Sequence, residues 1–593
     1  MRESRKAGAK MIKQIALALG IAASSLFAQG KVMLERADWQ VKNYTVLGDK
    51  DCKKFDPSIQ QASMDIPNVQ FVDSYLITDE GKVCTSQEWE KQKKECSVFV
   101  SREKIDATPT IVLNYRRERV NQMFGTPDPK TLENWINNTI RAYEDKDNLK
   151  IQHPKPGKVV LVDDWRQVLV EIANWNCEDR YPVLFKKHPL TKKFIERYNP
   201  TEVLKSNSGL YGHIDENLIR RCLAASLGPE GMLDNVSDSL ESRLEDKGVV
   251  LVDLKDRNIL LGGLALASAH KQRLVFIDRS LYKTEDLLTE KQAKGLRDRI
   301  HKKIENLDSL DYLTVACDLS FAFRGKYEFL DEKYSLDNLL VRDKEGKKFA
   351  YHGRLTGNEA LYQAMCAIFL QPKDALFFNT IWDNLYQTHH SDNAVQFSES
   401  ILNTTQVKRP ECTEKRLREE LKKGYGLVLF QSRGTPDGFT VYGGRDIANK
   451  FGFYEKTSFD EDGKGSINSL DLPLPTIFLA NPHSYAGANP YNNNTIGGKL
   501  LDEGAYIFFG AVSEPAQSHF NTPADIIVSL LNGNTIAEAL QDRSIAQGSY
   551  YPPKEDGDFF YYDALPDGTK VSRLIFIGDP MHKLNLVRKD DAK

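Results

Sequence analysis

Three short apolar runs between residues 426 and 510 constrain the fold of this chain more than any other feature. They are Gly426–Phe430, Thr476–Ala480 and Ala505–Gly510. Each run is free of charged residues and bounded by turn residues, which is typical of strands buried on both faces of a parallel sheet. A helical pattern at Thr413–Lys423 precedes the first run, with a threonine as its N-cap and a glycine after its end. The sequence therefore predicts an α/β fold with a mostly parallel sheet.

The same alternation of apolar runs and helical patterns continues toward the N-terminus. It predicts strands at Lys158–Asp163, Tyr181–Phe185, Gly248–Asp253, Arg273–Asp278 and Asp311–Cys317, and helices at Trp165–Trp175, Ile259–His270 and Lys291–Leu307. Thr356 and Glu359 have the spacing of a capping box and predict the start of another helix that continues through Leu370. Residues 147–156 are polar, contain prolines and are predicted to be a linker. We therefore expect a small α/β layer at residues 157–240 and a larger α/β domain at residues 248–593.

Length and charge limit the classes of partner. The chain has 593 residues, enough for several domains. Its formal net charge is -3, so no basic footprint argues for nucleic acid, and we expect no nucleic-acid partner. The hydrophobic share of 41% and charged share of 27% are those of an ordinary soluble globular protein.

The first 28 residues have the pattern of a secretion signal. Basic residues from Arg2 to Lys13 precede the apolar stretch Ile15–Ala23, and cleavage after Ala28 fits the pattern. The apolar stretch is too short to span a bilayer, and no cysteine closely follows it, so we expect no membrane or lipid anchor. The mature protein is expected in the periplasm or outside the cell. There the buried-looking Cys222, Cys317 and Cys366 are either disulfide-bonded or free core thiols.

Residues 31–147 resemble a thioredoxin-like domain. Thr108, Pro109 and Thr110 precede an apolar strand, as in the cis-proline loop of thioredoxins, with Pro109 as the candidate cis-proline. The thioredoxin redox motif needs two cysteines, but Asp49 stands at the attacking position and only Cys52 remains. Because the exchange cycle starts with a reactive thiolate, we expect no catalysis here. Cys52 is then a structural or free thiol, with a mixed disulfide as the alternative.

The C-terminal part of the chain resembles gingipain-type cysteine peptidases, which have a caspase-like fold. The resemblance is carried by four segments that follow one another in that family's order: His352–Gly357, Lys423–Gly434, Leu474–His483 and Ile575–Pro580. It implies that one strand ends in a catalytic His and the next in a catalytic Cys. By spacing, these positions hold Arg433 and Pro482. A guanidinium cannot act as a base near neutral pH and proline has no nucleophile, so no catalytic residue is expected.

Other polar residues follow the same strands, where open α/β sheets bind ligands. They are Ser432, His483, Ser513 and Glu514. One interpretation is a hydrogen-bonded remnant of the former pocket. The other is a hydrolase that uses Ser, His and Glu, which depends on a geometry that sequence does not give. The chain lacks the Gly-x-Ser-x-Gly pattern of a nucleophile elbow.

Residues 460–471 have the length of a calcium-binding loop. The candidate ligands are Asp460, Asp462, Asn468 and Asp471. Lys464 occupies a position where a ligand is needed, so a solvated acidic loop is the alternative. Apart from this calcium ion, we expect no cofactor.

The loss of both nucleophiles favours retention of binding surfaces over retention of two reactions. We therefore expect an exported, non-catalytic protein that binds a peptide or protein through degenerate peptidase and thioredoxin-like clefts. The alternatives are a hydrolase that uses non-cysteine residues and a thiol-redox helper that acts through Cys52.

Overall fold

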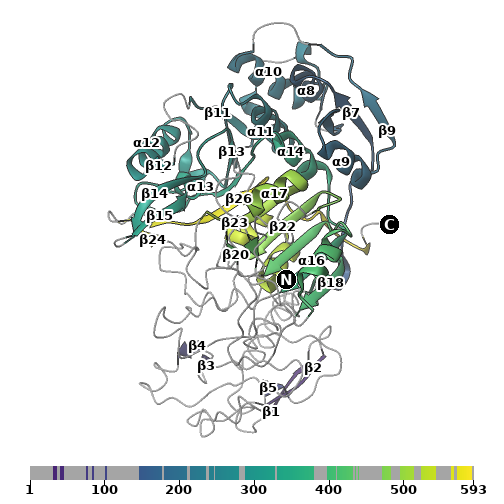
Figure 1. Cartoon of the computed structure of the whole chain (residues 1–593), viewed down its shortest axis with the longest axis vertical. Coiled ribbons are helices and arrows are strands. Elements are labelled where there is room, and N and C mark those ends of the chain that lie inside the picture. The colour runs from purple at the N-terminus through teal and green to yellow at the C-terminus, as the bar shows by residue number, and fades with distance from the viewer. Residues whose placement is uncertain are drawn as a thin grey trace, which may run out of the picture.

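A ten-stranded sheet forms the centre of the computed structural model (Figure 1). The structure describes residues 31–35, 40–45, 75–77, 83–85, 101–102, 146–176, 179–209, 214–235, 240–245, 247–278, 287–327, 330–379, 395, 397–408, 411–431, 434–435, 438–439, 471–481, 495–512, 523–541, 563–565 and 570–590. The sheet has two halves with one strand between them. Half A contains β10 (Gly248–Val252), β11 (Arg273–Phe276), β13 (Tyr312–Ala316) and β16 (Tyr351–Arg354). Half B contains β17 (Asp374–Asn379), β18 (Asn403–Lys408), β19 (Leu427–Gln431), β22 (Thr476–Asn481) and β23 (Ala505–Ala511).

The strand between the halves, β26 (Leu574–Ile577), is the last of the ten in the chain. The spatial order is β11-β10-β13-β16-β26-β23-β22-β19-β17-β18. Neighbouring strands are parallel except β26 and β23, so the two halves run in opposite directions. The prediction of an α/β fold with a mostly parallel sheet is therefore confirmed.

Helices cover both faces of the sheet. One face carries α11 (Arg257–His270), α14 (Ala360–Phe369), α18 (Pro523–Leu531) and α19 (Ile536–Gln541). Their apolar side chains join those of both halves in one continuous cluster, the shared core, which includes Val250, Leu361 and Phe377. On the other face, α12 (Glu290–His301) and α13 (Leu336–Leu340) cover the half-A core, which includes Leu251 and Leu339. There α16 (Glu414–Leu421) and α17 (Ile496–Glu503) cover the half-B core, which includes Leu417 and Phe478.

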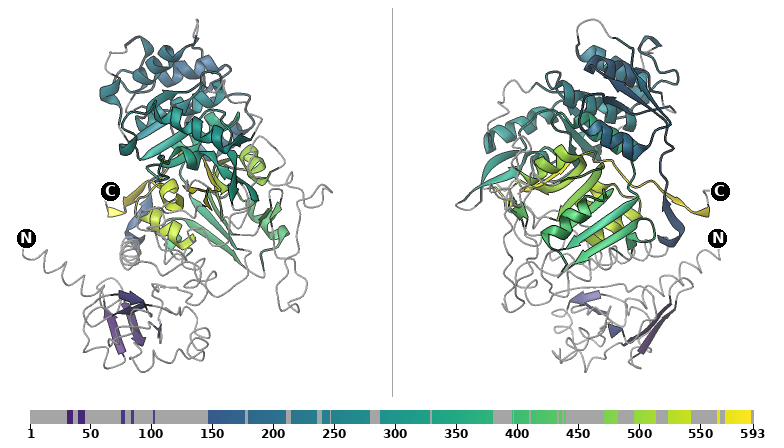
Figure 2. Two further views of the ribbon diagram at one scale, coloured as in Figure 1. Left: turned by 90° about the vertical axis from the view of Figure 1, so that its left-hand side faces the viewer. Right: turned by 45° about the vertical axis from the view of Figure 1, so that its right-hand side comes forward.

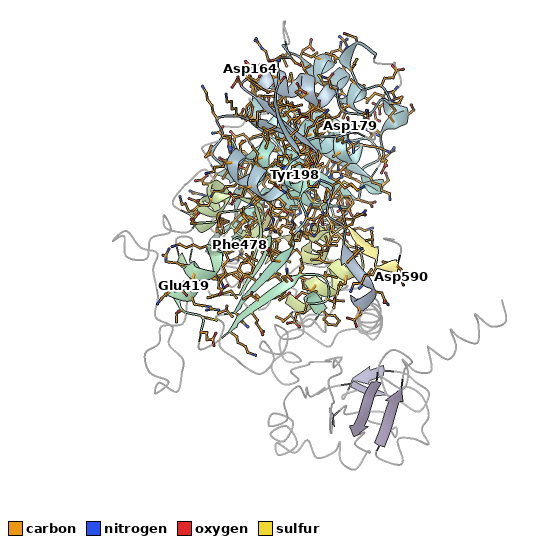
Figure 3. The ribbon with its side chains drawn as sticks, turned by 90° about the vertical axis from the view of Figure 1, so that its right-hand side faces the viewer. Asp164, Asp179, Tyr198, Glu419, Phe478 and Asp590 are labelled. Carbon is orange, nitrogen blue, oxygen red and sulfur yellow. The ribbon has the colours of Figure 1, made fainter. Side chains whose placement is uncertain are left out.

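A small parallel sheet and its helices, from residues 157–240, pack against this body. The sheet has β7 (Lys158–Val162), β8 (Val183–Phe185) and β9 (Glu202–Lys205), and the helices are α8 (Trp165–Ala173), α9 (Leu190–Tyr198) and α10 (Glu216–Ser226). Lys193 Nζ donates to the carbonyl oxygens of Leu472 and Glu503 at 2.8 Å each, and Arg197 Nη2 lies 3.2 Å from Asp374 Oδ1. Tyr198, the last residue of α9 and labelled in Figure 3, packs its ring 6.3 Å from that of Phe369 in α14. The layer is thus held to half B through α9.

The remaining elements are short. They are β12 (Leu288–Thr289), β14 (Ala322–Tyr327) and β15 (Leu330–Ser335) in one sheet; the pairs β20 (Gly434–Thr435) with β21 (Gly438–Phe439) and β24 (Asp563–Ala564) with β25 (Lys570–Val571); β1 (Lys31–Glu35), β2 (Gln40–Thr45) and β5 (Ser101–Arg102) in a second sheet; β3 (Tyr75–Ile77) with β4 (Val83–Thr85); and the 3-10 turns η1 (Lys146–Asn148), η2 (Leu233–Asn235), η3 (Glu241–Arg243) and η4 (Leu307–Ser309). Only five short strands of residues 31–147 precede η1 among the described residues, so the thioredoxin-like domain stays a prediction.

The structure differs from the sequence prediction at three places. Residues 149–151 of the expected linker form β6 (Leu149–Ile151), which pairs with the C-terminal β27 (Leu586–Arg588), seen as blue and yellow strands in the right view of Figure 2. Thr356 does not cap α14; its backbone N–H donates to Gln363 Oε1 at 3.2 Å, and the helix begins only after Glu359. Helix α12 ends at His301, before the predicted end at Leu307, and residues 307–309 form the separate turn η4.

Two further expectations concern cysteines and membranes. Cys222, Cys317 and Cys366 are buried free thiols, as is Cys412. No helix in the described ranges is both long and apolar enough to cross a bilayer.

Candidate functional site

The ends of the central strands of half B lie side by side at one edge of the sheet. In the strand register, Asn379 of β17 is opposite Gln431 of β19, and Gln431 is opposite Asn481 of β22. Strand β23 follows as the next neighbour and ends at Ala511. Ligands of open α/β sheets bind at this carboxyl edge, so we call it the candidate edge.

Four phenylalanine rings fix the register that brings these strand ends together. Phe378, Phe430, Phe478 and Phe508 belong to four neighbouring strands and are all buried in the half-B core. Successive ring centroids are 5.5, 5.9 and 6.4 Å apart. A slip by one residue would turn a strand's ring to the opposite face, so this row holds the strand ends at one level.

Most of the predicted site residues lie outside the described residues. Ser432 and Arg433 come directly after β19 in the sequence, and Pro482 and His483 come directly after β22. The described strands bring their own last residues, Gln431 and Asn481, together, and the predicted dyad positions lie outside the described residues. The following predicted residues are not described: Ser432, Arg433, Pro482, His483, Ser513, Glu514, Asp49, Cys52, Pro109, Asp460, Asp462 and Asn468.

Asp471 is the one residue of the predicted calcium loop within the described ranges. Its side chain is 54% exposed, and Oδ1 lies 3.8 Å from Lys193 Nζ. Within the part of the chain that the structure describes, no group of three or more His, Cys, Asp or Glu is arranged to hold a metal ion. The calcium site stays a prediction.

The candidate edge also contains residues that the sequence analysis did not place there. Because β26 is antiparallel to β23, its amino end lies at this edge, with Leu574 opposite Ala511. The Val512 N–H donates to the Arg573 carbonyl oxygen at 2.7 Å, and the Arg573 guanidinium lies 5.5 Å from the ring centre of Tyr334 in β15. Strand direction is decided by long-range pairing, so no local sequence signal could have placed Arg573 at this edge.

The corresponding edge of half A is filled by its own side chains. Cys317 follows β13 and is 1% exposed; burial raises the pKa of its thiol well above the usual range, so it is not a nucleophile. Arg354, the last residue of β16, is paired with the buried Asp337, and its guanidinium donates to the carbonyl oxygens of Leu319 and Ser320. This edge offers no exposed reactive group at these positions.

His352, in the motif that contributes to the peptidase resemblance, is a core residue. Its side chain lies within half A at 2% exposure, and neither ring nitrogen has a hydrogen-bond partner among the residues that the structure describes. Burial holds its pKa well below the usual value, with Lys348, Arg342 and Arg354 lowering it further. The ring is therefore neutral, and its burial keeps it from acting as a base on a substrate.

Comparison with known proteins gives only a distant likeness. No protein-family description and no curated protein sequence matches the chain. Among solved structures, the crystal structure of the Arg-specific cysteine proteinase gingipain R has a TM-score of 0.37 and 10% identity, over 57% of this chain and 79% of that one. A complex of Porphyromonas gingivalis RgpB pro- and mature domains gives 0.37 and 11% over the same shares. This chain is thus distantly similar in structure to gingipain-type, caspase-like proteases over 57% of its length.

Proposed function

We propose that this chain is an exported, non-catalytic protein that binds a peptide or protein at the candidate edge of half B. The observation that carries the proposal is the pairing of Gln431 with Asn481. Arg433 and Pro482 follow these two residues in the sequence within one or two positions, where the resemblance implies a base and a nucleophile. Neither residue type can fill its role, because guanidinium keeps its proton and proline has no nucleophilic atom.

The residue types at this edge favour an anionic group on the ligand. Arg433 offers five donors in a planar fork that matches a carboxylate or phosphate. The filled edge of half A supports half B as the binding side, since Arg354 and Asp337 satisfy each other there. We therefore propose that the bound segment carries an acidic side chain or a free C-terminal carboxylate.

The absence of peptidase activity is tested with the purified mature protein and a peptide library. We expect no cleavage, with or without a thiol-directed covalent inhibitor. Thiol-dependent cleavage that the inhibitor abolishes would contradict the non-catalytic assignment.

Binding is tested with Arg433→Ala, Arg433→Lys and an immobilised acidic peptide. We expect Arg433→Ala to weaken binding while the melting temperature stays nearly unchanged, and Arg433→Lys to restore binding only partly because it lacks the planar fork. Lys415→Ala is the matched control, since the Lys415 side chain is 86% exposed on α16. If Arg433 instead pairs with a buried carboxylate such as Glu514, its removal should cost about 3 kcal/mol of stability. Such a loss without any change in affinity would end the proposal at this site.

A further inference from the structure

The junction between half A and β26 is the weakest hydrogen-bonded seam of the ten-stranded sheet. Strand β26 has four paired residues with β23 but only one with β16, Ile577 opposite Arg354. Every other pair of neighbouring strands in this sheet has at least four paired residues in the described ranges. One further bond crosses the seam, from the Gly578 N–H to the Arg354 carbonyl oxygen at 2.7 Å.

Side-chain packing across this seam differs between the two faces of the sheet. On the face of α11 and α14, the shared core continues from half A to half B without a break. On the opposite face, the half-A core and the half-B core are separate clusters. One face therefore holds the halves together while the other contains a boundary between two packed units, and this is the arrangement of a hinge.

Side chains exchanged across the boundary keep it closed. Phe321 and Ala322 follow β13 of half A, yet they are buried in the half-B core, and the half-buried Leu287 packs against the same core. In return, Leu565 and Val571 from the C-terminal region are buried in the half-A core.

Arg354 connects the seam with the inserted Phe321. It is the β16 residue that pairs with β26, and its guanidinium holds the carbonyl oxygens of Leu319 and Ser320. The same guanidinium lies 4.1 Å from the ring centre of Phe321. The segment that inserts Phe321 into half B is therefore positioned by a residue on the seam.

We propose that the β16–β26 seam is a hinge between the two halves, latched by insertion of Phe321 into the half-B core. In the open form the shared core stays packed, and the face that carries the two separate cores opens as Phe321 leaves the half-B core. The hinge proposal does not rest on the proposed function, but hinge opening would affect the candidate edge. The Ser335 N–H of β15 donates to the Ser572 carbonyl oxygen at 2.8 Å, next to Arg573, so opening would change one wall of that edge.

The test compares two phenylalanines of the same segment in the full-length protein. Phe321 is 4% exposed and lies in the half-B core, whereas Phe323 is 0% exposed and lies in the half-A core. Spin labels are attached through an unnatural keto amino acid at the exposed positions of Lys302, after α12, and Lys415, on α16. We expect Phe321→Ala to add a longer-distance population that wild type and Phe323→Ala lack. An unchanged distance distribution in Phe321→Ala, or the same change in both variants, would overturn the hinge.

Amide exchange gives a second measurement without labels. The Gly578 N–H crosses the seam, whereas the Leu355 N–H bonds to the Val315 carbonyl oxygen at 3.0 Å within half A. In wild type we expect Gly578 to exchange faster than Leu355, and Phe321→Ala to accelerate Gly578 much more than Leu355. Equal protection of the two amides in both proteins would also overturn the hinge.

Discussion

Removing the carboxylate of Asp337 should destabilise half A by several kcal/mol. Asp337 and Arg354 are each 1% exposed at the side chain, and both carboxylate oxygens of Asp337 accept hydrogen bonds from this guanidinium. Asp337→Ala removes the carboxylate and leaves the cation in the core beside the neutral carbonyl oxygens of Leu319 and Ser320 and the ring of Phe321. Breaking a buried pair from one side costs about 3–5 kcal/mol, and we expect a loss in that range.

Urea unfolding of wild type and variants measures this loss. The matched control is Glu419→Ala, which removes a 3.9 Å contact to Lys415 between side chains that are 86% and 51% exposed, and should change stability by less than about 0.5 kcal/mol. The double variant Arg354→Met with Asp337→Leu removes both charges and should be more stable than Asp337→Ala alone. A loss below about 1 kcal/mol for Asp337→Ala, or a double variant that is less stable than the single one, would refute the reasoning.

Three further predictions follow from single sites. His352→Leu should raise stability by about 1–3 kcal/mol in thermal melts, because it removes two buried ring nitrogens that have no hydrogen-bond partner in the described part of the chain, and unchanged or lower stability would contradict this. Burial alone would raise the pKa of Asp579, but the charge and hydrogen bond of His270 outweigh it and lower the pKa from its usual value of 3.8. The stabilisation that the ionised Asp579 gives the folded state is therefore present above pH 3.8 and is lost as pH falls through the folded-state pKa. The destabilisation by His270→Ala, measured by urea unfolding, should therefore shrink in that acid range; a pH-independent effect would refute the linkage. The mature protein should not accelerate insulin reduction over the blank, whereas Asp49→Cys should, and activity of the unmodified protein would mean that the redox motif is misread.

Apolar runs predicted the centre of the sheet well because burial on both faces leaves a local signal. The three runs of the C-terminal part became β19, β22 and β23, displaced by a residue or less at their starts. All three strands continue one residue beyond the apolar run, and in β19 and β22 this added residue is polar, Gln431 and Asn481, because backbone pairing does not depend on the side chain. These polar ends form the candidate edge, so the strand residues that define this edge fall just outside the apolar runs that predicted the strands.

Long-range pairing accounts for what the sequence did not predict. Strand β18 is at the sheet edge, and its residues are mostly half-exposed or exposed, so it has no apolar run to mark it. The apolar residues of β26 predict a strand, but only tertiary contacts decide that it lies between β16 and β23 and is antiparallel to β23. The placement of Arg573 at the candidate edge, and the seam itself, depend on that choice.

The Gly-Asp-Pro motif after β26 has a structural explanation in the packing around it. Gly578 has φ 127°, and a Cβ there would lie 2.7 Å from Ile507 Cγ1. A Cβ at Gly353 would lie 2.5 Å from the Gly578 carbonyl oxygen, so both glycines are needed where the chain crosses β16. Asp579 then accepts a hydrogen bond from His270 at the end of α11, with a 2.7 Å separation. These requirements are met entirely within the core and involve no substrate. The motif therefore follows from the crossing of the chain over the sheet.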